Sequence, residues 1–525
     1  MSAIPYRSLQ ISLAAALCAL LAACSTPAPQ NSQQVPLPPV TNALAQSGAR
    51  ADLLINRLSF GANAASYQQI TAMGPDRYLD QQLRARSSQL PAAIQTQIDA
   101  LTISQTPFET LVRQMEAQRI ESERQKGTDD TLRKTYQQEM NRLAREAASR
   151  NLLRAVYSSS QLQEQMTWFW MNHFSIFSGK HNIRAMIGDF EESAVRPNAL
   201  GNFRDLLRAT VYHPAMLRYL DNEYNAVNKI NENYARELLE LHTLGVNGGY
   251  TQKDVQELAR VLTGVGVNIH PHPDAPKLRP EAARLYVRKG LFEFNPQRHD
   301  FGDKLILGKV IRGRGLAEVD EVIDMLCTQP ATARFVSKKL AQFFVSDQPD
   351  EALISKMSAA FLQSDGSIPY TLRSMFDSPE FARSLGQQFK DPLHYVVSAL
   401  RLSYEGSTIV NTAPALNWLN MMGQPYYGHL TPDGYSLNAS AWSSAGQMST
   451  RFDLARIIGN GNPNLFRVDG QQATEKFQTP VLSGTPYLKT VLPFLSNDTR
   501  QALAQAKNSN EWNLLFLASP EMMHR

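Results

Sequence analysis

The stretch from Asn231 to Asp254, NENYARELLELHTLGVNGGYTQKD, places two titratable side chains within an apolar helical pattern. On a helical wheel of about 100° per residue, Glu237 lies between leucines and His242 lies inside the apolar arc. Burying a carboxylate or an imidazole without a partner is costly, so each group needs something to satisfy it. Glu237 is therefore a candidate general base. The alternative is a polar core network in which an arginine or backbone N–H groups bind it.

Glu240 and His242 point to different sides of this predicted helix, so the letters ELLELH do not form a metal motif by themselves. Glu240 falls four residues after Arg236 on the polar side, which is typical of a weak surface ion pair. For His242 the alternative to a functional role is a core histidine bound to a carbonyl oxygen.

A second histidine lies in an aromatic helical stripe. In LQEQMTWFWMNHFSIFSGKH, His173 shares one face with Phe169 and Trp170, and Asn172 lies at the edge of that face. An amide at this place can orient an imidazole or bind a ligand hydroxyl. We consider His173 a candidate catalytic residue and Asn172 a candidate ligand-binding residue, against the alternative of a satisfied core histidine.

A third histidine lies in an irregular segment, FNPQRHDFGDKLILG, where His299 and Asp300 are flanked by Phe294 and Phe301. A loop histidine beside an aspartate is well placed for acid–base chemistry or metal binding. The alternative is a turn, because the sequence from Asp300 to Gly302 is also good turn chemistry.

Carboxylates and amides crowd one predicted loop, YLDNEYNAVNKINEN. We expect Asp221, Asn231 and Asn233 either to cap helices and hold the loop, or to bind sugar hydroxyls or hard cations. A separate carbohydrate-binding surface is a further hypothesis. It would use the aromatic residues Trp418, Tyr426, Tyr427, Tyr435 and Trp442.

No standard catalytic or cofactor motif occurs: there is no P-loop, G-x-G-x-x-G, H-E-x-x-H, G-x-S-x-G or EF-hand loop. The identity of any cofactor or metal therefore stays unknown. The three cysteines are Cys18, Cys24 and Cys327. We expect the first to leave with a signal peptide and the second to carry lipid, so Cys327 is left without a disulfide partner at a buried helical position.

The N-terminus predicts export. Residues 9–21 form an apolar run of signal-peptide length, and Leu21-Ala22-Ala23-Cys24 resembles a bacterial lipobox. The alternative is an ordinary signal with a chance cysteine. Ser25 follows Cys24, which by resemblance to Gram-negative lipoproteins predicts the outer membrane, held by palmitate and related acyl chains. We assign 1–23 to the lipoprotein signal peptide and 24–48 to a disordered, Pro- and Gln-rich tether.

The rest of the chain, 49–525, predicts one large all-α domain with at most a few short strands. We expect a polar helical hairpin over 108–150, helices near 151–177 and 233–244, and an irregular insertion over 265–315. Short strands are indicated near 284–294 and 303–311. Gly245 follows the last periodic residue of its helix, as a terminating glycine does, and Thr251 with Asp254 forms a capping box.

The composition excludes one class of partner. The 525 residues carry a net charge of only +4, with 43% hydrophobic and 19% charged residues. Nucleic-acid-binding proteins concentrate basic residues on one face, and no such face is evident, so we expect no nucleic acid.

An ordered set of motifs carries a family resemblance: LLINRLSFGA, FWMNHF, LRYLDN, NENYARELLELHTLGVNGGYTQKDVQELARVLTG, HDFGDKLILG, ARFVSKKLAQFFVSD, MMGQPYYGHLTPDGYS and LASPEMMHR. From about residue 50 onward the chain resembles the bacterial family called domain of unknown function 1800. The resemblance implies an exported, mainly helical protein, often encoded beside a companion exported protein. It implies no known activity, and no catalytic residue can be transferred.

Three hypotheses follow. The first is a hydrolase, with or without a metal ion, that acts on envelope or extracellular polymer. In it, Asn172, His173, Glu237 and His299–Asp300 converge on one cleft. The second is a non-catalytic envelope lipoprotein that assembles or exports a partner. The third is the carbohydrate-binding protein described above.

Overall fold

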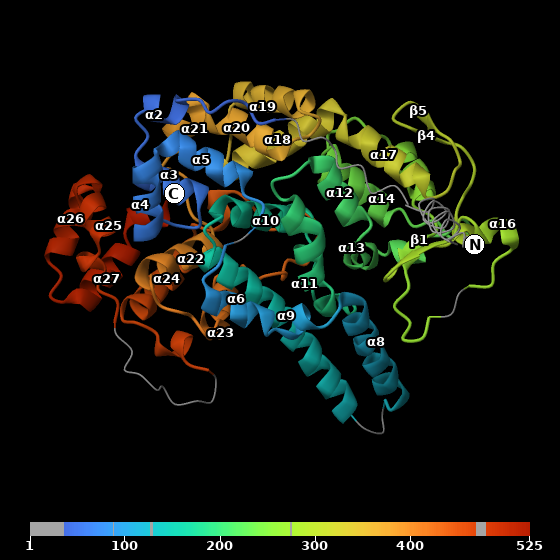
Figure 1. Ribbon diagram of the computed structural model, residues 1–525, viewed down its shortest axis with the longest axis horizontal. Helices are drawn as coiled ribbons and strands as arrows, with labels where there is room; N and C mark the ends of the chain where they lie inside the picture. The colour runs from blue at the N-terminus through green and yellow to red at the C-terminus, as the bar shows by residue number, and fades with distance from the viewer. Residues whose placement is uncertain (1–35, 88, 127–129, 274–275, 469–478) are drawn as a thin grey trace, which may run out of the picture. The chain divides into compact units, whose positions relative to one another are not determined.

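The computed structural model describes residues 36–87, 89–126, 130–273, 276–468 and 479–525. The predicted signal peptide, Cys24 and most of the predicted tether lie outside these residues. Figure 1 shows a mainly helical chain, so the predicted all-α class is confirmed. No helix in the described ranges is long and apolar enough to cross a membrane.

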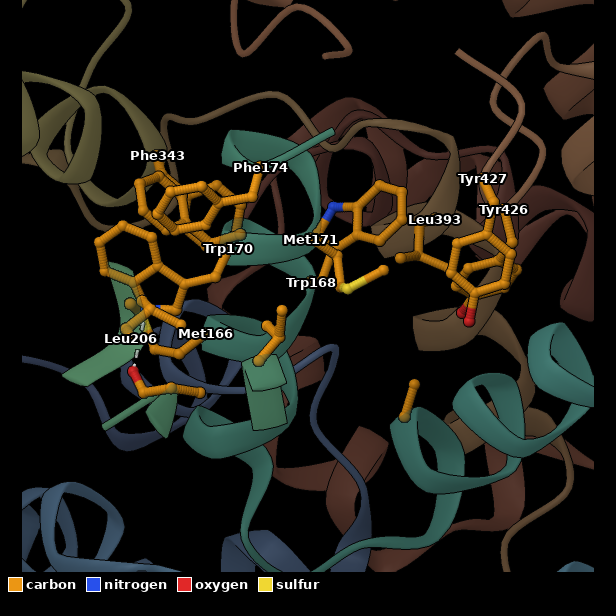
Figure 2. Close-up of a cluster of buried hydrophobic side chains, with 14 of the residues drawn as sticks. Met166, Trp168, Trp170, Met171, Phe174, Leu206, Phe343, Leu393, Tyr426 and Tyr427 are labelled. Carbon is orange, nitrogen blue, oxygen red and sulfur yellow. Dashed lines mark hydrogen bonds between the residues drawn. The ribbon is translucent and has the colours of Figure 1, made fainter. Parts of the chain in front are cut away.

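Helix α10 (Gln161–His173) lies at the centre of the packing, because all of its residues are buried. On one side of it Trp170 and Phe174 lie near Phe343, and on the other Trp168 and Met171 lie near the tyrosines of the 423–437 segment (Figure 2). The predicted single apolar stripe is thus only part of what this helix buries.

The polar side of α10 can be buried because its charged side chain pairs with an opposite charge. Glu164 forms an ion pair with Arg196, which also binds Glu191 at 2.7 Å. The Tyr427 hydroxyl donates to the same Glu191 at 2.5 Å. Each of these charges has an opposite charge or a donor beside it, which lowers the cost of burial.

Two long helices precede α10. Helix α8 (Phe108–Arg124) and helix α9 (Thr131–Tyr157) lie side by side and extend together from the rest of the helices in Figure 1. Part of the turn predicted between them, 127–129, lies outside the described residues.

The helix predicted near 151–177 is interrupted in the structure. Helix α9 ends at Tyr157, and α10 begins only at Gln161. The three serines between them favour this break, since the Ser158 hydroxyl accepts the Ser160 backbone N–H at 3.1 Å and such local bonds compete with the helix.

The strands lie where the irregular insertion was expected, and each is only three residues long. Strand β1 (Val265–Val267) and strand β2 (Val287–Lys289) both pair antiparallel with β3 (Phe292–Phe294), with Phe294 opposite Val265 and Val287. Strand β4 (Lys304–Ile306) pairs with β5 (Lys309–Ile311) as a hairpin. The two predicted strand regions are confirmed.

The remaining helices surround these elements. In the first half of the chain they are α2 (Ala43–Gln46), α3 (Ala51–Leu58), α4 (Ala64–Met73), α5 (Pro75–Arg84), α6 (Ala92–Asp99), α7 (Thr102–Gln105), α11 (Ile187–Asp189), α12 (Phe203–Val211), α13 (Pro214–Tyr219), α14 (Asn233–Glu237) and α15 (Gln252–Val261), with π-helices η2 (Phe190–Val195) and η5 (Leu238–Thr243).

In the second half they are α16 (Pro280–Ala283), α17 (Ala317–Cys327), α18 (Pro330–Phe344), α19 (Glu351–Gln363), α20 (Ile368–Phe376), α21 (Pro379–Ser384), α22 (Pro392–Ser403), α23 (Ala413–Met421), α24 (Ala445–Gly459), α25 (Pro486–Val491), α26 (Asn497–Ala504), α27 (Ser509–Leu517) and α28 (Pro520–Met523). Cys327 at the end of α17 is buried, as expected, and burial raises the pKa of its thiol.

Candidate functional site

A cleft of about 570 Å³ lies between the loop that follows η5 and one face of α18. The α18 residues that line the cleft are spaced three to four positions apart, as residues on one side of a helix are. This face carries an aromatic ring and three cationic side chains. The residues that line the cleft are Leu241, Leu244, Gly245, Val246, Asn247, Ala331, Arg334, Phe335, Lys338, Lys339, Gln342 and Asp433.

The helix that borders this cleft is not the regular α-helix that the periodicity predicts. Helix α14 ends at Glu237 and continues as the π-helix η5, in which the Leu244 backbone N–H donates to Leu239 O at 2.8 Å. The Thr243 hydroxyl donates to Leu238 O at 2.6 Å. A π-helix has a wider turn than the wheel assumes, and such segments occur frequently at functional sites.

Two buried histidines lie beneath the cleft. The ring centroids of His173 and His242 are 6.3 Å apart, and each residue is 1% exposed. The His173 Nε2 lies 3.1 Å from the carbonyl oxygen of His242. Because a carbonyl oxygen only accepts, His173 carries its proton on Nε2 and leaves Nδ1 as a free acceptor.

The hydrogen bonds of this pair are incomplete. Within the described ranges, His173 Nδ1 and both ring nitrogens of His242 are buried without a partner. Burial, with a contribution from the Lys339 ammonium, lowers the pKa of His242 to about 3 and holds the pKa of His173 well below its ordinary value. Both rings are therefore neutral near neutral pH.

Lys339 connects the histidines with the cleft. Its Nζ lies 5.6 Å from the centroid of the Phe335 ring. It makes no ion pair within 4.0 Å in the part of the chain that the structure describes. Burial lowers the pKa of Lys339 to about 8, while the more distant Asp433 carboxylate acts in the opposite direction. We call His173, His242 and Lys339 the cleft cluster.

Glu237 lies one turn before Leu241, a residue of the cleft wall. It is half-buried, and no hydrogen bond to its carboxyl is found among the described residues. Burial and then repulsion from Glu240 raise the pKa of Glu237, with a further contribution from Asp433, while Arg236 opposes them. The Glu237 carboxyl, which the helical pattern predicted to point inward, is thus only partly buried.

Asn172 fixes the segment that carries Asp433. Its side-chain Nδ2 donates to Tyr435 O at 2.9 Å, and its Oδ1 accepts the Tyr435 N–H at 2.7 Å. Gly434 packs so closely on Asn172 that a Cβ atom there would lie 2.2 Å from the Asn172 carbonyl oxygen. Asn172 therefore positions one wall of the cleft, which differs from the ligand-binding role expected from the sequence.

His299 and Asp300 belong to a different environment. His299 Nε2 lies 3.0 Å from Glu318 Oε1, and its Nδ1 lies 2.8 Å from Thr263 O. Lys304 Nζ binds the other oxygen of Glu318 at 2.5 Å. We call His299, Lys304 and Glu318 the paired cluster.

The charges next to the paired cluster are also satisfied. Burial alone would raise the pKa of Glu318, but its bonds to His299 and Lys304 outweigh burial and keep that pKa below its usual range. Asp300 binds Arg260 at 2.7 Å, and this bond lowers the pKa of Asp300. Neither residue of the predicted His299–Asp300 pair has a free functional atom facing a cleft.

The contacts of the two clusters do not overlap. His173 packs against Phe203, Phe335 and neighbours on α10, whereas His299 packs against Phe294 and Phe301. Of the predicted catalytic set, the structure brings His173 and Glu237 to the region of the cleft and leaves His299 and Asp300 elsewhere. Among the residues described, no group of three or more His, Cys, Asp or Glu side chains could hold a metal ion.

The amide-rich loop is held by its own polar side chains. Asn231 Nδ2 donates to Asp221 O at 3.2 Å, and Asn233 Nδ2 donates to Leu220 O at 3.2 Å. Asp221 adopts a left-handed φ of 59° and binds Lys180 at 2.8 Å. These three candidate ligand-binding residues thus have structural partners.

The aromatic residues of the carbohydrate-binding hypothesis are mainly core residues. Trp418 is 4% exposed, Tyr426 and Tyr427 are each 8% exposed, and Trp442 is 7% exposed. Tyr435 is partly buried and donates its hydroxyl to Pro425 O at 2.7 Å. These rings do not form an open platform for sugars.

Sequence reasoning did not find a serine, aspartate and histidine that meet in three dimensions. Ser193 and His213 both bind Asp189 Oδ2, at 2.9 and 3.1 Å, beside a groove of about 730 Å³. However, His213 Nδ1 accepts the Ala215 backbone N–H at 3.1 Å. The histidine therefore has no free basic nitrogen for the serine, and this group is not a catalytic triad.

The sequence analysis also did not identify Lys339 and Asp433 as candidate site residues. Asp433 does lie in GQPYYGHLTPDGYS, an irregular segment of the length that often builds sites, and this was the available signal. Nothing local distinguishes Lys339 from Lys338 beside it.

Comparison with known proteins gives a family and no function. The sequence model of a family described as "Protein of unknown function (DUF1800)" matches residues 53–524. No curated protein and no solved structure matches the chain.

Proposed function

The chain belongs to the DUF1800 family, whose function is unknown, and we propose that it is an exported hydrolase of an envelope or extracellular polymer. Its predicted lipobox supports lipidation at Cys24 and anchoring in the outer membrane. The cleft beside α18 is the proposed substrate site, because it measures about 570 Å³ and its wall begins at Leu241, one helical turn after the perturbed Glu237 carboxyl.

The observation that carries the proposal is the state of Glu237. A half-buried carboxyl with a raised pKa retains its proton closer to neutral pH and can protonate a leaving-group oxygen. Asp433 is 62% exposed in its side chain and lines the same cleft. Two carboxyl groups in unequal environments are the arrangement that polymer hydrolysis by acid–base catalysis requires.

The cleft also indicates the charge of the substrate. Three cationic side chains line it, Arg334, Lys338 and Lys339, and only Asp433 opposes them. Arg334 is partly neutralised by Glu351, at 2.5 Å in an exposed pair. Phe335 lies between these cations and offers an apolar surface to a sugar ring. We therefore propose a substrate chain that carries negative charges.

The test compares Glu237 with its neighbour Glu240. The full-length chain and the Glu237→Gln and Glu240→Gln variants are incubated with peptidoglycan sacculi, an acidic polysaccharide such as alginate, and neutral dextran. Released ends are then counted. The Glu237→Gln variant should lose about 10²–10⁴-fold in rate.

Glu240→Gln is the matched control because its carboxylate lies one turn away and binds the Tyr250 hydroxyl at 3.2 Å. It should remain active, but the alkaline limb of its rate profile should move to lower pH, since Glu240 repulsion helps to raise the pKa of the acid Glu237. Equal activity of Glu237→Gln and wild type, or no turnover of any polymer by wild type, would contradict the hydrolase proposal.

A second candidate is an envelope lipoprotein that assembles or exports a companion protein. The observation that favours it is a pair of exposed apolar side chains near the cleft: Val246 is 64% exposed and Leu430 is 69% exposed. If Val246→Ser and Leu430→Ser abolish cross-linking to a neighbouring-gene product while polymer turnover is absent, this candidate replaces the first.

A further inference from the structure

Lys390 is a buried lysine that no carboxylate neutralises. It is 2% exposed and lies just before α22. Its Nζ donates to Ser398 Oγ at 3.1 Å and lies 3.9 Å from Met522 Sδ. These are its only side-chain bonds within the described ranges. An ammonium group without an opposite charge is strongly disfavoured in such a place.

The surroundings of Lys390 are cationic. Arg451 donates to the Lys390 carbonyl oxygen at 2.6 Å, and Arg525 lies in the same buried region. The nearby Asp391 carboxylate is engaged by His394 Nδ1 at 3.0 Å. Burial, then repulsion from Arg451 and Arg525, lowers the pKa of Lys390 to about 7. A substantial share of the lysine is therefore a neutral, nucleophilic amine at neutral pH.

A small cavity reaches this amine. Lys390 and Ser398 line a space of about 90 Å³ between α3, α22, α25 and α27. The Asp52 and Glu521 carboxylates line it too, but Asp52 is bound by Arg50 at 2.6 Å, and Glu521 accepts the Ser496 N–H and the Thr499 hydroxyl, each at 2.8 Å. A cavity needs about 10–15 Å³ of such volume to hold one water, so a molecule as small as carbon dioxide fits this space. A polymer of the kind proposed for the cleft cannot enter it.

Three reactions of a neutral lysine beside a serine can be compared. A Schiff base with an aldehyde would create a protonated imine, which the surrounding cations disfavour. Acyl transfer to Ser398 would need N–H groups to stabilise an oxyanion, but Ser398 lies inside α22, where backbone N–H groups are committed to the helix. Reaction with carbon dioxide instead creates an anion, which Arg451 and Arg525 stabilise.

We propose that Lys390 is a carbamylation site whose ligand is carbon dioxide. The neutral Nζ attacks the carbon of carbon dioxide, a new N–C bond forms, and one C=O electron pair moves to oxygen. The proton lost from nitrogen goes to solvent, so the product is a carbamate anion and the step needs no oxidant or reductant. The step converts a neutral amine into an anion near Arg451 and Arg525, whose charges act on this nitrogen.

The test uses the full-length chain in neutral-to-alkaline buffer containing ¹³C-labelled bicarbonate. We expect one carbamate resonance in the ¹³C spectrum that is present in wild type and lost in Lys390→Met and Lys390→Arg. Trapping the carbamate of wild type by alkylation, followed by digestion and mass spectrometry, should place the added mass on the Lys390 peptide.

Lys304 is the internal control, because it is equally buried, at 1% exposed, but its Nζ binds the Glu318 carboxylate at 2.5 Å. Its peptide should remain unmodified in the same digest. A missing resonance, a resonance that persists in Lys390→Met, or equal labelling of the Lys304 peptide would overturn the proposal. The trapping experiment decides the question with wild-type protein if the variants fail to fold.

Discussion

The paired cluster and the cleft cluster contain the same kinds of side chain in opposite states. In the paired cluster, both nitrogens of His299 and the Nζ of Lys304 lie within hydrogen-bond distance of oxygen atoms, and the side chains of His299, Lys304 and Glu318 are fully buried. In the cleft cluster, the two nitrogens of His242 have no described partner, and Lys339 makes no described ion pair within 4.0 Å.

The two clusters thus distinguish buried polar groups that are paired with other side chains from buried polar groups whose atoms have no described partner. A buried charge that is broken from its partner is costly, so removing one member of the paired cluster should destabilise the fold. A buried group that has never had a partner gives up little stability when it is replaced, and its polar atoms remain free for a ligand, a buried water molecule or a proton. Proximity of histidine to aspartate in sequence does not distinguish the two cases.

The largest effect should follow from breaking the paired cluster. Glu318→Gln keeps the shape of the side chain but leaves Lys304 without its opposite charge, so we expect a loss of about 3–5 kcal/mol in the free energy of unfolding. Denaturant titration of the full-length chain measures it.

Glu321→Gln is the matched control for this variant. Glu321 binds Lys309 and Arg314, but its side chain is 23% exposed, and surface pairs contribute about 0–1 kcal/mol. If the two variants unfolded at the same denaturant concentration, the paired cluster would not be the stabilising unit described here.

The next effect is a pH dependence from the cleft cluster. The pKa of His242 is about 3 in the folded chain and 6.5 ordinarily, so between these values the unfolded chain binds one more proton. Stability is then lost as pH falls below 6.5, at up to about 1.4 kcal/mol per pH unit from this histidine. The loss is complete below pH of about 3.

His242→Phe removes this contribution, so its stability should fall less steeply than that of wild type between pH 6.5 and 4, in urea titrations at each pH. His272→Phe, at an exposed loop position, should follow the wild-type curve. Parallel curves for wild type and His242→Phe would mean that His242 is not held neutral.

A smaller loss of stability should follow from removing the hydrogen bonds that hold the Tyr435 segment beside the cleft. Asn172→Ala removes two hydrogen bonds to the Tyr435 backbone and should cost about 1–3 kcal/mol. Amide hydrogen exchange at Tyr435 should accelerate by more than it does elsewhere. Asn247→Ala, at an exposed residue of the same cleft, should change neither quantity; an equal effect from both would show that Asn172 is not the positioning residue.

The smallest expected change in stability, from His242→Phe at neutral pH, tests most directly whether the two clusters differ in their partners. At neutral pH, His242→Phe should change the free energy of unfolding by less than about 1 kcal/mol, because no hydrogen bond of the His242 ring is broken. His299→Phe should cost about 1–3 kcal/mol more, because it removes the hydrogen bonds of the His299 ring to Glu318 Oε1 and Thr263 O. Equal losses at the two positions would reveal a partner of His242.

Much of the fold follows from local pattern. Apolar periodicity predicted the helices, and β2 to β5 occur within the two predicted strand regions, whereas β1 (Val265–Val267) was not predicted. Thr251 and Asp254 form the predicted capping box, with the Thr251 N–H donating to Asp254 at 2.8 Å. Gly245 has the positive φ, 82°, that a helix-terminating glycine adopts.

The candidate site was predicted only in part. Glu237 and His173 were identified because a polar group in an apolar helical arc is visible in the sequence. The wheel failed at η5, since one π-helical turn rotates every later side chain. The partners of His299 could not be foreseen either, because Glu318 lies nineteen residues further along the chain and Thr263 lies thirty-six residues before it.

The sequence by itself determined the helical class, the helix boundaries at Gly245 and Thr251, and the positions of the titratable groups, since these depend on periodicity and on neighbours within a few residues. Only the tertiary structure decided which of those groups have partners. Asn172 meets Tyr435 across 263 residues, and Lys339 and Asp433 reach one cleft from separate elements. Hydrogen bonds and ion pairs act over a few ångströms of space, whatever the distance along the chain.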